Sequence, residues 1–248
     1  MNNSIRFFTA AALATCAVGI AQAYTVYSGV DGNGAEVALA STPNSAAAEM
    51  AFKLNLIGVG TENFESQVTG STTPLALNFG AAGNATLQGG TGFVNSVAAG
   101  STNGVGRYSV PGGTQYFETV AGGSSTFSIA FQQDVAAFGF YGIDIGDISG
   151  TVKVEFLNAS DIVVGSLAVA TATTGLQNGS VLYFGAIAQS NAELFRSVRF
   201  ISTGVDDFFG FDSFSVGAQS QISRVPEPAS LALIGIALLG LGLSRRRV

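Results

Sequence analysis

Five aspartates of this 248-residue chain lie in two short, glycine-containing stretches, and they are the side chains best suited to chemistry. Asp144 and Asp147 are three residues apart, and Asp206 and Asp207 precede Asp212 in a phenylalanine-rich run. Calcium ions take about six to eight hard oxygen ligands, which flexible loops can supply. The pattern predicts a structural Ca²⁺ site as one role of these residues. The alternative is a local role, because aspartates in turns and caps accept hydrogen bonds from nearby backbone N–H groups.

Paired carboxylates also serve in glycoside hydrolysis, where two acids lie about 5–10 Å apart across the scissile bond. The sequence does not fix any such separation, and the chain has no tryptophan, a common platform for sugar rings. It also has no histidine, and its one cysteine is Cys16. A Ser-His-Asp or Cys-His nucleophile and the usual zinc ligand sets are therefore excluded. We assign no catalytic residue and expect a protein that is not an enzyme.

The first 23 residues predict a secretory signal peptide. Arg6 supplies a positive start, residues 7–20 are apolar, and Ala21 and Ala23 fit the small-x-small rule for signal cleavage. Cys16 lies inside this signal, so the exported chain would carry no thiol. Residues 24–224 contain six basic and fifteen acidic residues, a formal charge of −9. Such a surface repels phosphate backbones, so we expect no nucleic-acid partner, whereas cations or neutral polysaccharide remain compatible.

The body of the chain favours strands over helices. One short amphipathic helix is expected after Thr42, with Pro43 at its first position and Gly58 as its stop. Its apolar positions follow the i, i+3, i+4, i+7 spacing of a helix face: Ala47, Met50, Ala51, Leu54 and Ile57. Strands are expected at residues 61–65, 126–131, 151–156, 162–170, 181–187, 198–201 and 208–216. These short strands, with turn signals between them, predict a mainly β protein, an antiparallel jelly-roll-like β-sandwich over residues 24–217.

A separate segment follows this body. Residues 218–224 are polar and are expected to form a tether. Pro226, Glu227 and Pro228 come next, then an apolar run of 13 residues at 231–243, then Arg245, Arg246 and Arg247. A membrane span usually needs about 20 apolar residues, so this run is a short transmembrane helix completed by its flanks. The arginines would keep its end on the cytoplasmic side. The alternative is a buried helix of the core.

The order of these three parts at residues 225–248 resembles the PEP-CTERM protein-sorting domain of Gram-negative bacteria that make exopolysaccharide. The resemblance implies that Pro226, Glu227 and Pro228 are recognised by an exosortase, a membrane-embedded cysteine protease, which cleaves nearby. It also implies that the arginines act as a retention cluster. Residues 138–147, 179–185 and 209–212 resemble passenger domains of such proteins, for which no chemistry is assigned.

These expectations give a leading hypothesis and two alternatives. The leading one is an exported β-sandwich protein that passes through the secretion machinery and is anchored in the inner membrane, facing the periplasm. An exosortase then sorts it to the cell surface or extracellular matrix. The first alternative is a carbohydrate-binding module acting on exopolysaccharide. The second is a carboxylate-dependent glycoside hydrolase.

Overall fold

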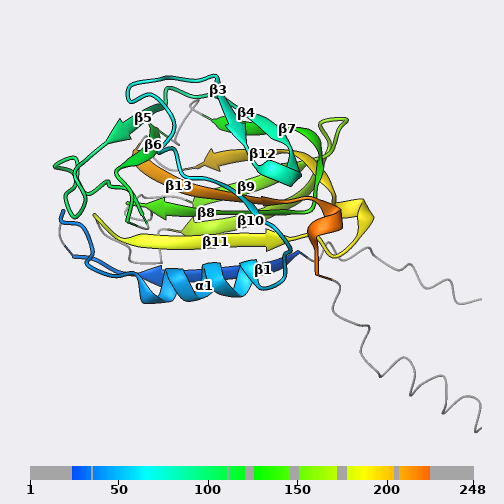
Figure 1. Ribbon diagram of the computed structural model, residues 1–248, viewed down its shortest axis with the longest axis horizontal. Coiled ribbons are helices and arrows are strands. Elements are labelled where there is room, and N and C mark those ends of the chain that lie inside the picture. The colour runs from blue at the N-terminus through cyan, green and yellow to red at the C-terminus, as the bar shows by residue number, and fades with distance from the viewer. Residues whose placement is uncertain are drawn as a thin grey trace, which may run out of the picture.

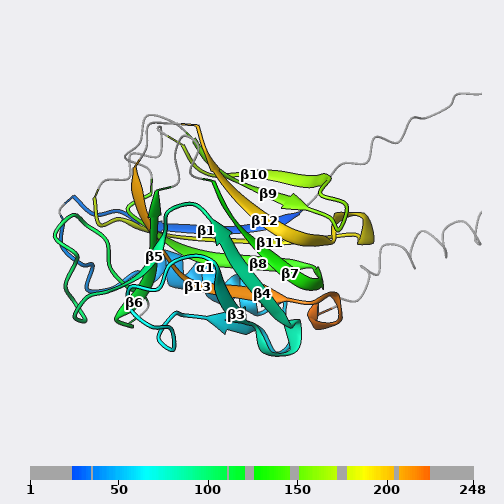
Figure 2. The same cartoon turned by 90° about the horizontal axis from the view of Figure 1, so that it is seen from above.

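The structure is a computed structural model that describes residues 24–34, 36–110, 112–120, 126–145, 151–171, 178–203 and 207–223. Two antiparallel sheets face each other, and helix α1 (Pro43–Lys53) covers the outer side of one of them (Figures 1 and 2). The predicted antiparallel β-sandwich with a short N-terminal helix is confirmed. The expected C-terminal helix lies outside the described residues.

The helix-covered sheet has the strand order β1-β11-β8-β13-β6-β5, and β2 pairs with β13. Its strands are β1 (Thr25–Asp31), β2 (Gly60–Glu62), β5 (Phe93–Ser96), β6 (Gln115–Val120), β8 (Ala137–Ile143), β11 (Val181–Ile187) and β13 (Phe208–Gly217). The open sheet has the order β10-β9-β12-β7-β4-β3. Its strands are β3 (Leu75–Asn78), β4 (Asn84–Gly89), β7 (Phe127–Val135), β9 (Thr151–Leu157), β10 (Val163–Thr171) and β12 (Phe195–Ser202). The described residues also include the short 3₁₀ helices η1 (Gly80–Ala82), η3 (Asn191–Glu193) and η4 (Gln219–Gln221).

Phenylalanine rings fill the space between the sheets. Side chains alternate across a strand, so every second residue of β9 and of the first half of β7, residues 127–131, reaches this inter-sheet core, as their period-two patterns predict. Phe127 stacks on Phe200 with ring centroids 4.3 Å apart, and Phe140 of the facing sheet meets Phe200 edge-on at 5.1 Å. Burying each such ring stabilises the fold by about 1.5–3 kcal/mol. The inter-sheet core therefore supplies most of the apolar stabilisation.

Two central strands of the helix-covered sheet are buried on both faces. All seven residues of β8 and of β11 are buried, because one face meets the open sheet and the other meets α1 and its neighbouring loops. The sequence predicts β11 at its observed bounds, but it gives no expectation for β8 or for β1. A strand buried on both faces lacks the alternation that marks a half-buried strand. β1 is an edge strand with mixed burial.

Helix α1 begins where the sequence predicts, but it ends at Lys53, before the predicted stop at Gly58, and most of its predicted apolar face points outward. An amphipathic helix normally turns its apolar stripe toward the core. Here Met50 and Leu54 are 63% and 76% exposed, whereas Ser45 and Phe52 are fully buried. The reason is close approach to the sheet. A Cβ added at Gly29 of β1 would lie 2.2 Å from the backbone oxygen of Asn44 and 3.1 Å from the Ala48 Cβ, so the first turns of the helix leave room only for small side chains on their inner face.

Residues 218–223 belong to the folded domain, in contrast to the tether expected at 218–224. Ile222 forms an isolated antiparallel bridge with Leu56, and the Ser223 N–H donates to the Asn55 carbonyl at 2.8 Å. The Gln221 side chain donates to the carbonyls of Ile57 and Gly58 and accepts from the Ala218 N–H. These contacts fasten the end of the domain to the segment just after α1. Among the described residues, no helix is long and apolar enough to cross a membrane.

Candidate functional site

Polar groups gather on the outer side of the helix-covered sheet, in a cleft of about 160 Å³ beside α1. Its lining comes from α1, β2 and the segment after it, the loop before β6 and the middle of β13: Glu49, Lys53, Thr61, Asn63, Glu65, Ser109, Val110, Gly113, Asp212 and Ser213. Three carboxylates thus line one cleft, and only Asp212 among them is expected from the sequence. Glu49 and Glu65 carry no local motif that marks them.

Asp212 reaches this cleft because β13 contains a β-bulge. The pairing of β13 with β8 shifts register between Asp212 and Ser215, and Ser213 adopts a left-handed φ of 49°. Without a bulge, strict alternation would place Asp212 and Phe214 on the same face. The extra residue instead leaves Phe211 and Phe214 in the inter-sheet core and turns Asp212 to the other side.

The Asp212 carboxylate is buried and fully engaged. One oxygen accepts from the Ser109 hydroxyl and the Val110 N–H, both at 2.8 Å, and the other accepts from the Ser213 N–H at 2.6 Å. Burial raises the pKa of Asp212 well above its ordinary value of 3.8, by more than these hydrogen bonds lower it. Its role in the described structure is to fasten the 109–110 loop to β13.

The other two carboxylates of the cleft are also bonded within the protein. Glu49 binds Lys53 at 2.6 Å and accepts from the Tyr141 hydroxyl at 2.8 Å. Glu65 accepts from the N–H groups of Thr114 and Gln115. Partial burial raises the pKa of Glu65, but its hydrogen bonds outweigh burial and leave that pKa below 4.5. Glu65 therefore joins the segment after β2 to the start of β6, and Glu49 joins α1 to β8.

Asp144 lies in a different network at the end of β8. It is 3% exposed and has a positive φ of 65°. The Arg107 guanidinium lies 3.1 Å from one Asp144 oxygen, and the Gly179 N–H donates to the other at 3.2 Å. Glu118 forms a second ion pair with Arg107 at 3.3 Å, and the Phe208 ring stacks on the guanidinium. A buried cation already balances these acids.

The five aspartates of the predicted calcium site have different surroundings. Asp144 and Asp212 take part in the two separate networks above, and Asp207 accepts from the N–H of the next residue, Phe208, at 2.7 Å. Asp147 and Asp206 lie outside the described residues. Within the described ranges, no group of three or more acidic side chains is arranged to hold a metal ion. The calcium site stays a prediction.

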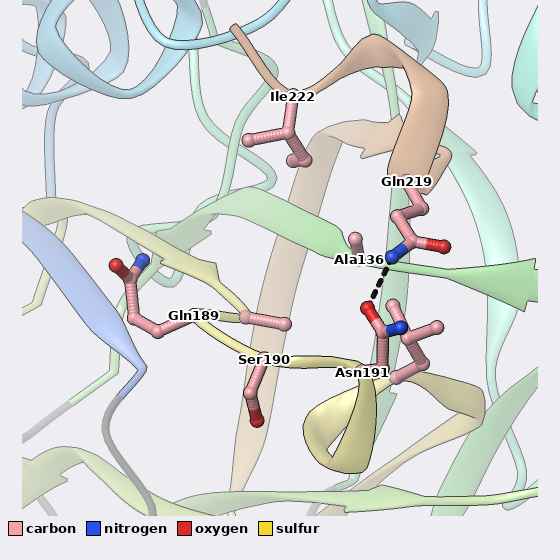
Figure 3. Close-up of a pocket in the computed structure, with 8 residues that line it drawn as sticks. Ala136, Gln189, Ser190, Asn191, Gln219 and Ile222 are labelled. Carbon is pink, nitrogen blue, oxygen red and sulfur yellow. Dashed lines mark hydrogen bonds between the residues drawn. The ribbon is translucent and has the colours of Figure 1, made fainter. Parts of the chain in front are cut away.

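A second pocket, of about 250 Å³, lies where the described chain ends (Figure 3). Neutral side chains line it, from the β7–β8 connection, the loop around η3, and η4: Ala136, Ala188, Gln189, Ser190, Asn191, Leu194, Gln219 and Ile222. The Gln219 amide donates to the Asn191 amide oxygen across its rim, which joins η4 to η3. Sequence reasoning does not find this pocket, because its polar residues are common loop residues far apart in the chain.

The other residues singled out in the sequence lie outside the described ranges. They are Ala21 and Ala23 of the signal cleavage site, and Pro226, Glu227, Pro228, Arg245, Arg246 and Arg247 of the C-terminal segment. The transmembrane span expected at residues 231–243 lies there as well.

Comparisons with solved structures give only remote likenesses. The chain is 15% identical to the K2 cleaved adhesin domain of Lys-gingipain, with a TM-score of 0.40 over 64% of this chain and 97% of that one. It is 10% identical to the CBM22-1–GH10 modules of xylanase 10B from Clostridium thermocellum, with a TM-score of 0.34 over 64% of this chain and 28% of that one. It is 9% identical to the family 11 carbohydrate-binding module of the same organism, with a TM-score of 0.32 over 68% of this chain and 99% of that one. Because all three TM-scores are below 0.5, we infer no function for this chain from these structures.

Comparison by sequence gives one clear result. No curated protein matches the chain. The family model described as the PEP-CTERM protein-sorting motif matches residues 224–247. Such a motif implies an exported protein that an exosortase processes from a membrane-anchored precursor. The chain therefore carries a PEP-CTERM protein-sorting motif, which begins directly after the last described residue of a two-sheet β domain.

Proposed function

We propose that this chain is a non-enzymatic component of the cell surface or extracellular matrix, and that its β-sandwich is the delivered cargo. The sorting motif at residues 224–247 carries this proposal. The position of the motif supports it, because residues as far as Ser223 are bonded into the β domain and the family match starts at residue 224. The signal peptide at residues 1–23 would start the route and the motif would complete it.

Each part of the C-terminal segment has a role in this proposal. Pro226, Glu227 and Pro228 are the recognition element for an exosortase. The apolar run 231–243 anchors the precursor, and Arg245, Arg246 and Arg247 hold its end at the cytoplasmic interface, where long basic side chains keep their charge in water. Cleavage near the first element would release the β domain from its anchor.

The bonding of the acidic side chains supports a role without catalysis. A general acid or nucleophile must meet its substrate through a carboxylate oxygen. In the described cleft, the oxygens of Asp212 and Glu65 already accept from backbone and hydroxyl groups, and those of Glu49 bind Lys53 and Tyr141. The proposed task of these groups is to hold loops in place.

Deletion of residues 225–248 tests the sorting route. We expect the full chain in the membrane fraction first and at the surface later, and the truncated chain as a soluble exported protein that is not sorted. Replacing Pro226 and Pro228 with alanine should retain membrane anchoring but block release, whereas changing the three arginines to lysine retains the charge and serves as the matched control. A truncated chain that reached the surface in normal amounts would refute the proposal.

Carbohydrate binding is the second candidate, and the amide-lined pocket of Figure 3 supports it. Neutral amides such as those of Gln189, Asn191 and Gln219 can exchange hydrogen bonds with sugar hydroxyl groups without charge. Against it, Phe208 is the one aromatic among the exposed large apolar side chains of the described residues. A glycan array with the exported chain and its Gln219→Ala variant tests this role; uniform absence of binding would remove it.

A further inference from the structure

The outward side of α1 and the residues just after it carry an apolar patch that is exposed to solvent in the described structure. We define this outer patch as Met50, Leu54 and Ile57, which are 63%, 76% and 65% exposed. Met50 and Leu54 are four residues apart, so they share one face of the helix. Together with Ala46 they line a shallow, mainly apolar hollow on that face.

The patch lies beside the point where the sorting segment begins. Ser223 is hydrogen-bonded to Asn55, and Ile222 is bridged to Leu56, so the end of the domain is fixed next to Leu54 and Ile57. Seven residues, 224–230, separate Ser223 from the apolar run 231–243. An extended chain spans at most about 3.6 Å per residue, so the run starts within roughly 30 Å of the patch.

This geometry limits what the patch can meet in the anchored precursor. If residues 231–243 lie in the bilayer, the short connection holds the C-terminal end of α1 close to the membrane surface. Three apolar side chains alone bind a bilayer weakly. A tether changes this, because it raises the effective concentration of the membrane at the patch. The charges beside the patch cancel, since Lys53 is paired with Glu49 at 2.6 Å, which suits an uncharged lipid surface.

We propose that Met50, Leu54 and Ile57 insert into the headgroup–acyl boundary of the bilayer while the precursor is anchored. The contact rests on the proposed function, since it needs the C-terminal anchor. It orients the precursor with α1 against the membrane and the open sheet away from it. Cleavage of the segment removes the tether and releases the contact.

Site-specific fluorescence tests the contact. The chain after residue 23 has no cysteine, so a single Leu54→Cys substitution accepts one polarity-sensitive probe. Val105→Cys is the matched control, because Val105 is 45% exposed and lies far from the patch along β11. A Cβ added at its neighbour Gly106 would lie 2.8 Å from the Gly179 N, just before β11 begins, whereas Ile222 lies near Ala188, just after β11 ends. Both variants of the precursor are reconstituted into phosphatidylcholine vesicles that carry a lipid-bound quencher.

We expect several-fold stronger quenching at position 54 than at position 105, a blue shift at 54 alone, and a partial loss of both when Ile57→Asp is added. Equal quenching at both positions, in a precursor that floats with the vesicles, would overturn the membrane contact. Disulfide-linked dimers of the unlabelled Leu54→Cys variant, without lipid quenching of the labelled one, would show that a second copy covers the patch, and would overturn it too. A precursor that does not float with vesicles would instead refute the anchor and the proposed function.

Discussion

The two faces of the helix-covered sheet are built in different ways. The inner face meets the open sheet through phenylalanines such as Phe138, Phe140 and Phe211, all fully buried. The outer face meets α1 and several loops through tyrosines, and most of their hydroxyl groups are bonded to polar partners. Tyr141 donates to Glu49 and Tyr116 donates to Glu118. The helix-covered sheet therefore has an apolar face toward the open sheet and a more polar face toward α1.

The cover of each face explains this difference. A sheet satisfies its own backbone groups, so a second sheet can meet it with apolar side chains alone. Loops leave backbone N–H groups without ladder partners, and buried carboxylates such as Asp212 accept from them. The inner face supplies stability through burial, whereas the outer face fixes loops through hydrogen bonds. Four substitutions test this division, in order of decreasing effect.

The largest effect is expected from Phe200→Ala in the inter-sheet core. Phe200 is fully buried and contacts Phe127, Phe140 and Phe211. Removing the ring leaves a cavity that a rigid core fills only in part, so the free energy of unfolding should fall by about 3–5 kcal/mol. Denaturant unfolding measures it, with Phe208→Ala, at 43% exposure, as the control. Equal losses for both variants would contradict the dominance of the inter-sheet core.

On the polar face, Arg107→Met should have the next largest effect. Met fills much of the volume but leaves Asp144 and Glu118 without their buried cation. Losing one partner of a buried pair typically costs about 3 kcal/mol or more. Arg196→Met breaks the exposed pair with Asp134 and should cost less than about 1 kcal/mol. Unfolding curves that lose the same free energy for both variants would rule out a special role for the buried cluster.

The close approach of α1 to β1 predicts a smaller loss for Gly29→Ala. The added Cβ would lie 2.2 Å from the Asn44 carbonyl oxygen, so the helix must shift, at a cost of about 1–3 kcal/mol. Gly32→Ala is the matched control, because its Cβ would meet no atom within 4 Å. Thermal unfolding compares them. Equal stability of the Gly29→Ala and Gly32→Ala proteins would mean that the contact between β1 and α1 tolerates a larger side chain.

The smallest effect concerns pH and Asp212. Burial raises the pKa of this carboxyl above 3.8 in the folded state, so the unfolded chain ionises first as pH rises. The contribution of Asp212 to stability is therefore complete below its unfolded pKa and is lost as pH rises toward the folded pKa. Asp212→Asn removes this dependence. As pH rises from 3.5, the free energy of unfolding of wild type should fall relative to that of the variant. A rise relative to the variant would contradict a raised pKa of Asp212 in the folded state.

Strand bounds could be predicted from the sequence better than contacts between distant residues. The run of β11 is apolar throughout and bounded by turn residues, and its predicted bounds match those observed. The site was harder to predict. Asp212 was singled out, but its partners Ser109 and Val110 are about a hundred residues away in the chain, and Glu49 and Glu65 lie on other segments again. Local patterns carry no information about such distant neighbours.

The sequence alone determined the β class of the domain, the start of its helix and the sorting motif, because strand alternation, a proline at the first helical position and the C-terminal motif are local properties of consecutive residues. Only the tertiary structure decided which side of each element is buried. The bulge at Ser213 turns Asp212 to the polar face, and the glycine-lined seat of α1 turns Met50 and Leu54 to solvent. Both outcomes depend on steric fit between segments that meet only in the fold.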